Sequence, residues 1–150
     1  FNKLLNNLKL NEDLEKRVYL RQLFITNSKK PDKVWSSWNF DTSDKKHQKH
    51  LGTLKEIKQD SYLKLDQFIK NENLNKVDFI KLDVDGKELE ILKGGAKVLS
   101  SVESVHVEIE GKNLIENLEE IEGIMSFAGL EEEESWRDKG SGRNRLYLRK

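Results

Sequence analysis

The sequence of residues 77–110 is VDFIKLDVDGKELEILKGGAKVLSSVESVHVEIE, and this stretch decides the fold. It begins with a short apolar run, Val77–Val84, which is typical of a strand buried on both faces. The segment Lys87–Ser100 is expected to form one helix, because its apolar side chains recur at helical spacing. Val102–Glu110 alternates apolar and polar side chains and predicts the next strand. A strand, a helix and a strand in this order indicate an open α/β sheet.

The rest of the chain continues the alternation of strands and helices. Gly94 and Gly95 weaken the helix that contains them, each by up to about 1 kcal/mol relative to alanine, and we expect them to allow close packing on the sheet. The other expected elements are helices at Phe1–Leu10, Asp66–Ile69 (with Asp66 as N-cap) and Asn113–Ala128 (ended by Gly129), strands at Arg17–Ile25, Lys55–Leu65, Glu131–Trp136 and Arg145–Arg149, and irregular segments at Thr26–Asp32 and Val34–Leu51. The last two strands are expected to form a hairpin around Gly140–Gly142.

The most specific motif is Asp83-Val84-Asp85-Gly86, which follows one expected strand and precedes a helix. Ligands of open α/β sheets bind beyond the carboxyl ends of the strands, so both aspartates are placed for a site. Asp85 has a second interpretation, because Glu88 three residues later completes a capping-box pattern in which Asp85 only caps its helix. Asp83 needs a partner, since an unpaired buried carboxylate is destabilising.

These motifs resemble a known family of enzymes. The segment VDFIKLDVDGKELEILKGGAKVL is similar to the signature of the FkbM methyltransferases, SYLKLDQFI to the segment that precedes it, and SVHVEIE to the following strand, which ends with a glutamate, here Glu108. The resemblance implies a Rossmann-like class I methyltransferase sheet with strand order 3-2-1-4-5-7-6, mostly parallel with an antiparallel C-terminal hairpin. No glycine-rich turn occurs near Phe1, so we expect a single partial domain, residues 1–150, without the first two strands.

The resemblance also implies the residues of the site. They are Asp83, Asp85 and Glu108 as catalytic residues, Asp83, Val84 and Gln22 as cofactor-binding residues, and Trp35, Ser36 and Ser37 as substrate-binding residues. Besides Asp85, two of these have a purely structural alternative: Glu108 would lie on a solvated strand face, and Trp35 would pack against the sheet. A Mg²⁺ ion held by Asp83, Asp85 and Glu108 is conceivable, because hard oxygen ligands suit this cation, but no metal site is assigned.

The implied reaction is transfer of a methyl group from S-adenosylmethionine to a hydroxyl oxygen of a sugar or small metabolite. One alternative is a truncated, non-catalytic domain or interaction module. Another is half of a dinucleotide-binding oxidoreductase, which would require a glycine-rich fingerprint after its first strand.

The composition limits the partners of the chain. The 27 basic and 27 acidic side chains cancel, so we expect no nucleic-acid or membrane partner, while a homodimer is allowed. There is no cysteine, which excludes disulfides and thiolate metal sites. No apolar run approaches the length of a membrane span, and no signal peptide is visible, so a cytoplasmic location is expected.

Overall fold

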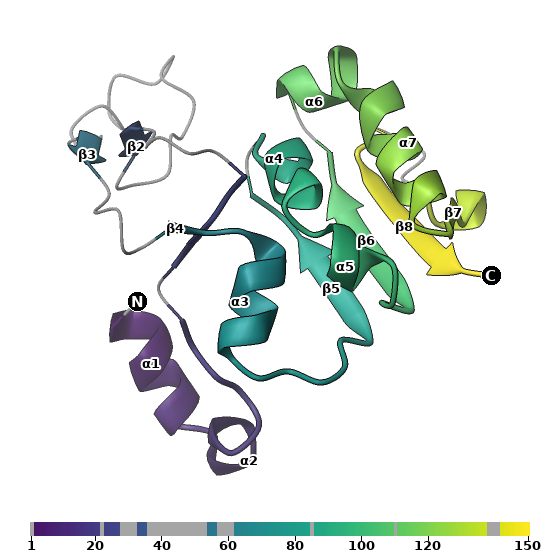
Figure 1. Cartoon of the computed structure of the whole chain (residues 1–150). Coiled ribbons are helices and arrows are strands. Elements are labelled where there is room, and N and C mark those ends of the chain that lie inside the picture. Colours follow the sequence, from purple (N-terminus) through teal and green to yellow (C-terminus); the bar gives the residue numbers. More distant parts are fainter. Residues whose placement is uncertain are drawn as a thin grey trace.

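Four strands form the main sheet of the protein (Figure 1). The computed structural model describes residues 2–21, 23–27, 33–35, 54–56, 62–84, 86–109, 111–137 and 142–150. Strands β5 (Phe79–Leu82), β6 (Ser104–Glu108), β8 (Asn144–Arg149) and β7 (Leu130–Glu132) lie in the order β5-β6-β8-β7. β5 and β6 are parallel, and the other two pairs are antiparallel. The order of these strands and the C-terminal hairpin agree with the prediction, although the sheet is mixed rather than mostly parallel.

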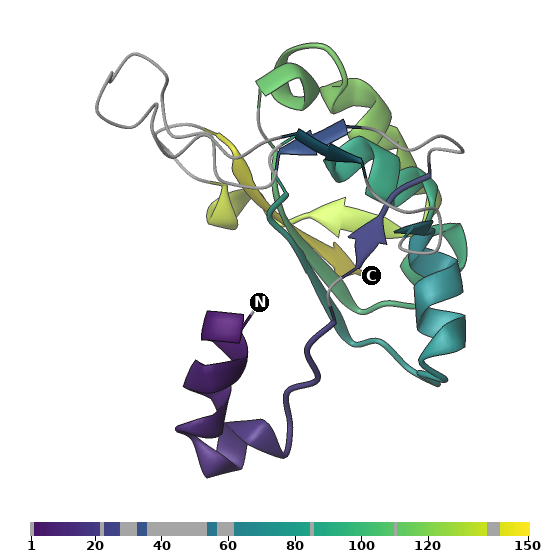
Figure 2. The same cartoon turned by 90° about the vertical axis from the view of Figure 1, so that its left-hand side faces the viewer.

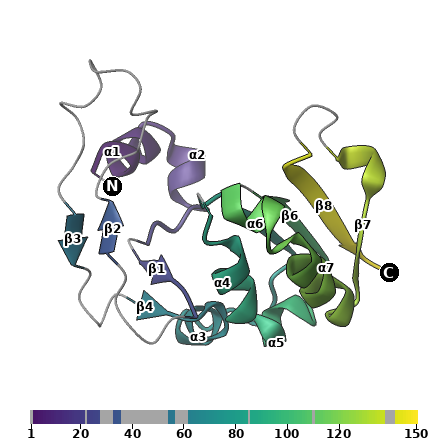
Figure 3. The ribbon, with the colours of Figure 1, turned by 90° about the horizontal axis from the view of Figure 1, so that it is seen from above.

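The core lies between this sheet and the helices on one of its faces. These helices are α4 (Glu88–Lys93), α5 (Ala96–Leu99) and α7 (Leu118–Phe127), and Figure 3 shows them on one side of the strands. They bury the apolar stripe that the sequence predicted, with Ile121 and Met125 of α7 fully buried against β6 and its neighbours. Gly129, at a φ of 76°, follows α7 as its predicted C-terminal glycine.

Strand β5 is buried on one face only, which corrects the prediction for Val77–Val84. Ile80 and Leu82 are buried, whereas Phe79 and Lys81 are exposed. The reason is that the helices described here cover only one side of the sheet. Strand β6 follows its predicted alternation, with Val105 and Val107 fully buried on the helix side.

The N-terminal part of the chain contributes small elements. Strand β1 (Phe24–Ile25) pairs in parallel with β4 (Tyr62–Leu63), and β2 (Lys33–Trp35) pairs antiparallel with β3 (Leu54–Glu56). Helix α1 (Asn2–Lys9) agrees with the prediction, and the short α2 (Glu12–Glu15) was not expected. Figures 1 and 2 both show α1 and α2 apart from the main sheet.

The predicted strand Arg17–Ile25 is reduced to the two residues of β1 in the described part of the chain. Val18 and Tyr19 are β-prone, but they are exposed, and the described residues provide no strand for this segment to pair with before Phe24. The predicted strand Lys55–Leu65 corresponds to parts of β3 and β4. The predicted strand Glu131–Trp136 is β7 followed by a 3₁₀ turn, η3 (Glu134–Trp136).

Two predicted helices are each interrupted. The segment Lys87–Ser100 forms α4 and α5, which are separated at Gly94 and Gly95. A Cβ atom on Gly95 would lie 2.7 Å from Cδ2 of Leu65, so the glycine allows close packing on the start of α3 (Leu65–Asn71), not on the sheet as predicted. The segment Asn113–Ala128 similarly falls into α6 (Gly111–Ile115) and α7.

Asp66 does not cap its own helix, which corrects a further prediction. The N-cap of α3 is Lys64. The carboxylate of Asp66 instead accepts hydrogen bonds from the backbone N–H groups of Lys97, at 3.1 Å, and Val98, at 3.0 Å. It therefore satisfies amide groups in the first turn of α5, and this contact joins two helices that are distant in sequence.

Candidate functional site

The carboxyl ends of β5 and β6 place two of the predicted site residues side by side. The register pairs Leu82 with Val107, so Asp83 and Glu108 take neighbouring positions one residue further along the two strands. Asp83 is about half exposed, and its Oδ2 lies 3.0 Å from Nζ of Lys81. Asp83 was predicted to need a partner, and it has one in Lys81, together with solvent.

Val84 and Glu108 complete the described part of this edge. Val84 is partly buried and packs against the apolar core, so it forms an apolar wall directly after Asp83. Glu108 is half-buried on the sheet face opposite Val107 and is paired with Asn144 of β8 in the strand register. His106 lies two residues before Glu108 on the same face, and its ring meets that of Trp136 edge-on at a centroid distance of 6.3 Å. The edge thus combines carboxylates, an imidazole and an apolar side chain.

A buried carboxylate lies directly behind this edge, and the sequence argument had assigned it only as half of a capping box. Glu88 has no exposed surface. Its Oε1 accepts a hydrogen bond from the backbone N–H of Gly86, at 2.9 Å, and its Oε2 accepts one from the side-chain amide of Asn113. The N-cap of α4 is Lys87, so Glu88 is the first residue of the helix and the predicted capping box is wrong. One sequence signal could have indicated burial: Glu88 is at helical spacing from Leu92.

A second carboxylate of α4 reaches the end of β1. Thr26 directly follows this strand and is buried, and its hydroxyl donates a hydrogen bond of 2.8 Å to Glu90 Oε2. Lys87 forms an ion pair of 3.2 Å with the other oxygen of Glu90. The segments that follow β1, β5 and β6 are therefore all in contact with side chains of α4.

Other predicted site residues lie outside the described side chains. Trp35 is the last residue of β2, and only its backbone is described. Gln22, Ser36, Ser37 and Asp85 lie outside the described residues. In the described ranges no three histidine or acidic side chains converge on a point that could hold a metal ion, and the suggested Mg²⁺ set includes Asp85.

The C-terminal hairpin holds a carboxyl and a phenol whose pKa values are shifted. Arg137 donates two hydrogen bonds to Glu132, at 2.8 and 2.6 Å, and lowers the pKa of that carboxyl, to which the nearby Arg145 also contributes. Burial raises the pKa of Tyr147 to about 12. Glu132 forms ion pairs with Arg137 and Arg145, which support β7 and β8 as structural charges.

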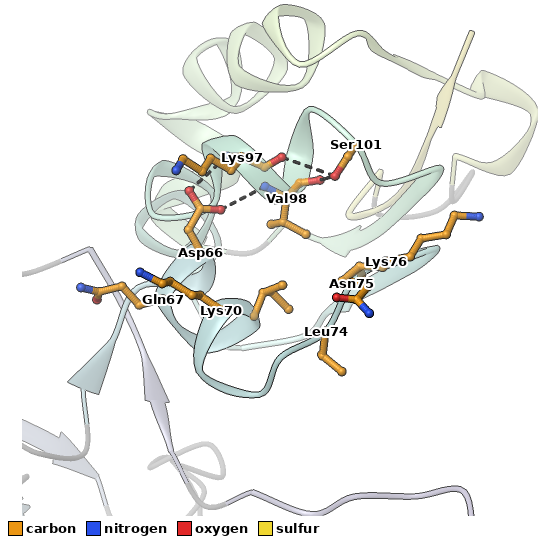
Figure 4. Close-up of a pocket in the computed structure, with 11 residues that line it drawn as sticks. Asp66, Gln67, Lys70, Leu74, Asn75, Lys76, Lys97, Val98 and Ser101 are labelled. Atoms are coloured by element: carbon orange, nitrogen blue, oxygen red, sulfur yellow. Dashed lines mark hydrogen bonds between the residues drawn. The ribbon is translucent and has the colours of Figure 1, made fainter.

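Two hollows among the described residues lie away from this edge. One, of about 410 Å³, is lined by α3, by α5 and by the residues just before β5, at the amino end of that strand (Figure 4). The other, of about 380 Å³, lies between α7 and the pair α4 and α5. No helix in the described part of the chain is long and apolar enough to cross a membrane.

Comparisons with known proteins give one finding. The family model described as the methyltransferase FkbM domain matches residues 1–134. Neither the curated proteins nor the solved structures contain a match.

Proposed function

The chain belongs to the FkbM methyltransferase domain family, and we propose that it transfers the methyl group of S-adenosylmethionine to a hydroxyl oxygen of a sugar or small metabolite. The observation that carries this proposal is the placement of Asp83 and Glu108 at neighbouring carboxyl ends of parallel strands. Such an edge is where open α/β sheets bind ligands. The order β5-β6-β8-β7 further supports a class I methyltransferase sheet, in which these strands are the fourth, fifth, seventh and sixth.

The chemistry of the described edge fits the cofactor. S-adenosylmethionine carries a cationic ammonium group, a cationic sulfonium group and ribose hydroxyls, all of which favour carboxylate partners. Asp83 presents a half-exposed carboxylate, and Val84 beside it offers an apolar surface for the uncharged parts of such a ligand. Gln22 is proposed as a further cofactor contact from the family resemblance.

S-adenosylmethionine supplies an electrophilic methyl group when it is bound. The residues of the chain then have to align the acceptor oxygen and remove its proton. We assign the alignment of the cofactor to Asp83 and Val84, and the acceptance of the hydroxyl proton to a carboxylate oxygen of Glu108 or Asp85. Trp35, Ser36 and Ser37 are proposed to contact the acceptor, with the indole ring against a flat face of a sugar.

The proposed function is tested by methyl transfer in the full-length protein. Radiolabelled S-adenosylmethionine is incubated with a panel of sugars and small hydroxylated metabolites, and label in the acceptor is measured. We expect Asp83→Ala to abolish transfer and Glu108→Gln to reduce it about 10²- to 10⁴-fold, as for loss of a general base. The matched control is Asp13→Ala, an exposed aspartate on α2, which should retain activity. Full activity in Asp83→Ala contradicts the assignment.

A further inference from the structure

The first residue of α4 is a buried carboxylate with a complete set of partners. Glu88 is fully buried, and a buried carboxylate is tolerated only where hydrogen bonds replace its hydration. Here one oxygen accepts from Gly86 N–H and the other from the side chain of Asn113. Asn113 is itself buried, and its Oδ1 accepts a hydrogen bond of 2.9 Å from Asn117. The direction of these hydrogen bonds is therefore fixed: Asn117 donates to Asn113, and Asn113 donates to Glu88.

These hydrogen bonds join two segments that are separated along the chain by α4, α5 and β6. Gly86 belongs to the turn after β5, which begins with Asp83, whereas Asn113 belongs to α6, which follows β6 and Glu108. Glu88 is thus the side-chain link between the turn after β5 and the helix after β6. The contact between Glu88 and Asn113 is buried, so leaving either of these polar groups unpaired would be destabilising.

Glu90 forms a hydrogen bond on the opposite face of α4. Residues two apart on an α-helix point about 200° from each other, so Glu88 and Glu90 face in nearly opposite directions. Glu88 reaches α6, and Glu90 receives the buried hydroxyl of Thr26 at the end of β1. Helix α4 is therefore held from both sides, directly behind the candidate edge.

We propose that Glu88 is a positioning residue: through Gly86 and Asn113 it fixes the turn after β5 against α6, and so holds Asp83 and Glu108 in the neighbouring positions that the strand register gives them. The effect on cofactor affinity rests on the proposed function, whereas the coupling of the two segments does not. Glu88 is not a catalytic residue in this account, because it is buried behind the edge and its carboxylate is used by the two hydrogen bonds.

The polarity of the network allows a rescue experiment. Glu88→Gln keeps an acceptor for Gly86 but turns an NH₂ group toward the NH₂ group of Asn113, in the orientation that the hydrogen bond from Asn117 gives to the Asn113 amide. Asn113→Asp alone places two carboxylates against each other. In the double variant the Gln NH₂ donates to the Asp, which still accepts from Asn117, so every hydrogen bond is restored. The matched control is Glu15→Gln, an exposed carboxylate on α2.

Amide hydrogen exchange of the full-length protein, without ligand, measures the coupling. Each single variant should speed exchange in peptides that contain Gly86 and in peptides that contain Asn113, and the double variant should restore both. Peptides from β8 report global loosening and should change little. Faster exchange in only one of the two segments, or in the whole protein equally, overturns the proposal. If Glu88→Gln fails to fold, Asn113→Ser, which retains the carboxylate, is measured against the same two segments.

Affinity for S-adenosylhomocysteine, measured by calorimetry well below the unfolding temperature, gives the functional readout. Glu88→Gln should weaken binding about tenfold, which corresponds to about 1.4 kcal/mol, and the double variant should regain most of it. Unchanged affinity with a lowered unfolding temperature shows a merely structural role and refutes the positioning. If the wild-type protein does not bind the probe, the proposed function fails, and the exchange data alone decide whether the two segments are coupled.

Discussion

Substituting Gly95 by alanine tests the packing that interrupts the predicted helix. The new Cβ would lie 2.7 Å from Leu65 Cδ2, 3.3 Å from Cγ and 3.4 Å from Cβ. The first contact involves the end of a side chain, but the other two and the burial of Leu65 limit how far it can turn away. Overpacking of a core typically costs about 1–3 kcal/mol, and we expect about 1–2 kcal/mol here because one flexible group can yield in part.

The matched control is the same substitution at Gly123, in the interior of α7. A Cβ there meets nothing within 4 Å, so Gly123→Ala should stabilise the protein by up to about 1 kcal/mol through helix propensity. Thermal and urea unfolding of both variants give the comparison, with about 2–4 °C expected per kcal/mol for a chain of this size. In a Leu65→Ala background, Cδ2 and Cγ are absent and only Cβ remains, at an ordinary contact distance of 3.4 Å, so Gly95→Ala should become nearly neutral.

Equal or greater stability of Gly95→Ala relative to wild type would refute this reasoning. Such a result would mean that α4 and α5 are separated for a reason other than the approach of Leu65. A cost of Gly95→Ala that persists in the Leu65→Ala background would lead to the same conclusion, because the two positions would then be independent.

Three further predictions concern the charges that support the fold. Asp66→Ala removes the acceptor for two backbone N–H groups of α5 and should lower the free energy of unfolding by about 1 kcal/mol. An unchanged urea midpoint would exclude a capping role. Arg145→Met should lower the free energy of unfolding by about 3 kcal/mol, the lower end of the range for a broken buried ion pair. The loss stays at this end because Glu132 keeps Arg137 as a partner and Glu122 is exposed to solvent; a loss below about 1 kcal/mol would contradict this. Because Arg137 lowers the pKa of Glu132, this carboxylate contributes its full stabilisation above its ordinary value of 4.5 and loses it as the pH falls through the lowered value. Acid unfolding should therefore destabilise wild type more steeply than Glu132→Gln, and parallel profiles would count against the linkage.

The sequence predicted the strands of the main sheet best where local patterns are strong. Strand β6 has a strict alternation of buried and polar side chains, and β5 is a short apolar run followed by a turn, so both were found, as was the antiparallel pairing of β7 and β8. Residues with β-propensity alone were misleading: Val18 and Tyr19 lie in a predicted strand but are exposed in the structure. Burial and pairing, which are tertiary properties, decide such segments.

The errors within the helical segments have the same origin. Gly95 lies between α4 and α5, where Leu65 of another helix approaches it, and Asp66 caps a helix that begins 30 residues away in sequence. For the site, position along the strand predicted that Asp83 would lie at the ligand edge, and the family resemblance implied Glu108. Neither predicted the half-exposed carboxylate of Asp83 or the buried network of Glu88. A capping-box pattern and a buried polar link can share the same residues in sequence, and only the packing distinguishes them.

The central claim is that S-adenosylmethionine binds at the carboxyl ends of β5 and β6. A nitrogen-15 NMR titration of the assigned protein with S-adenosylhomocysteine, up to about 1 mM, the upper end of usual enzyme affinities, tests this most directly. We expect saturable shifts that cluster on the amides of Asp83, Val84 and Glu108. Shifts that cluster at the hollow before β5, or no saturable shifts at all, would contradict it.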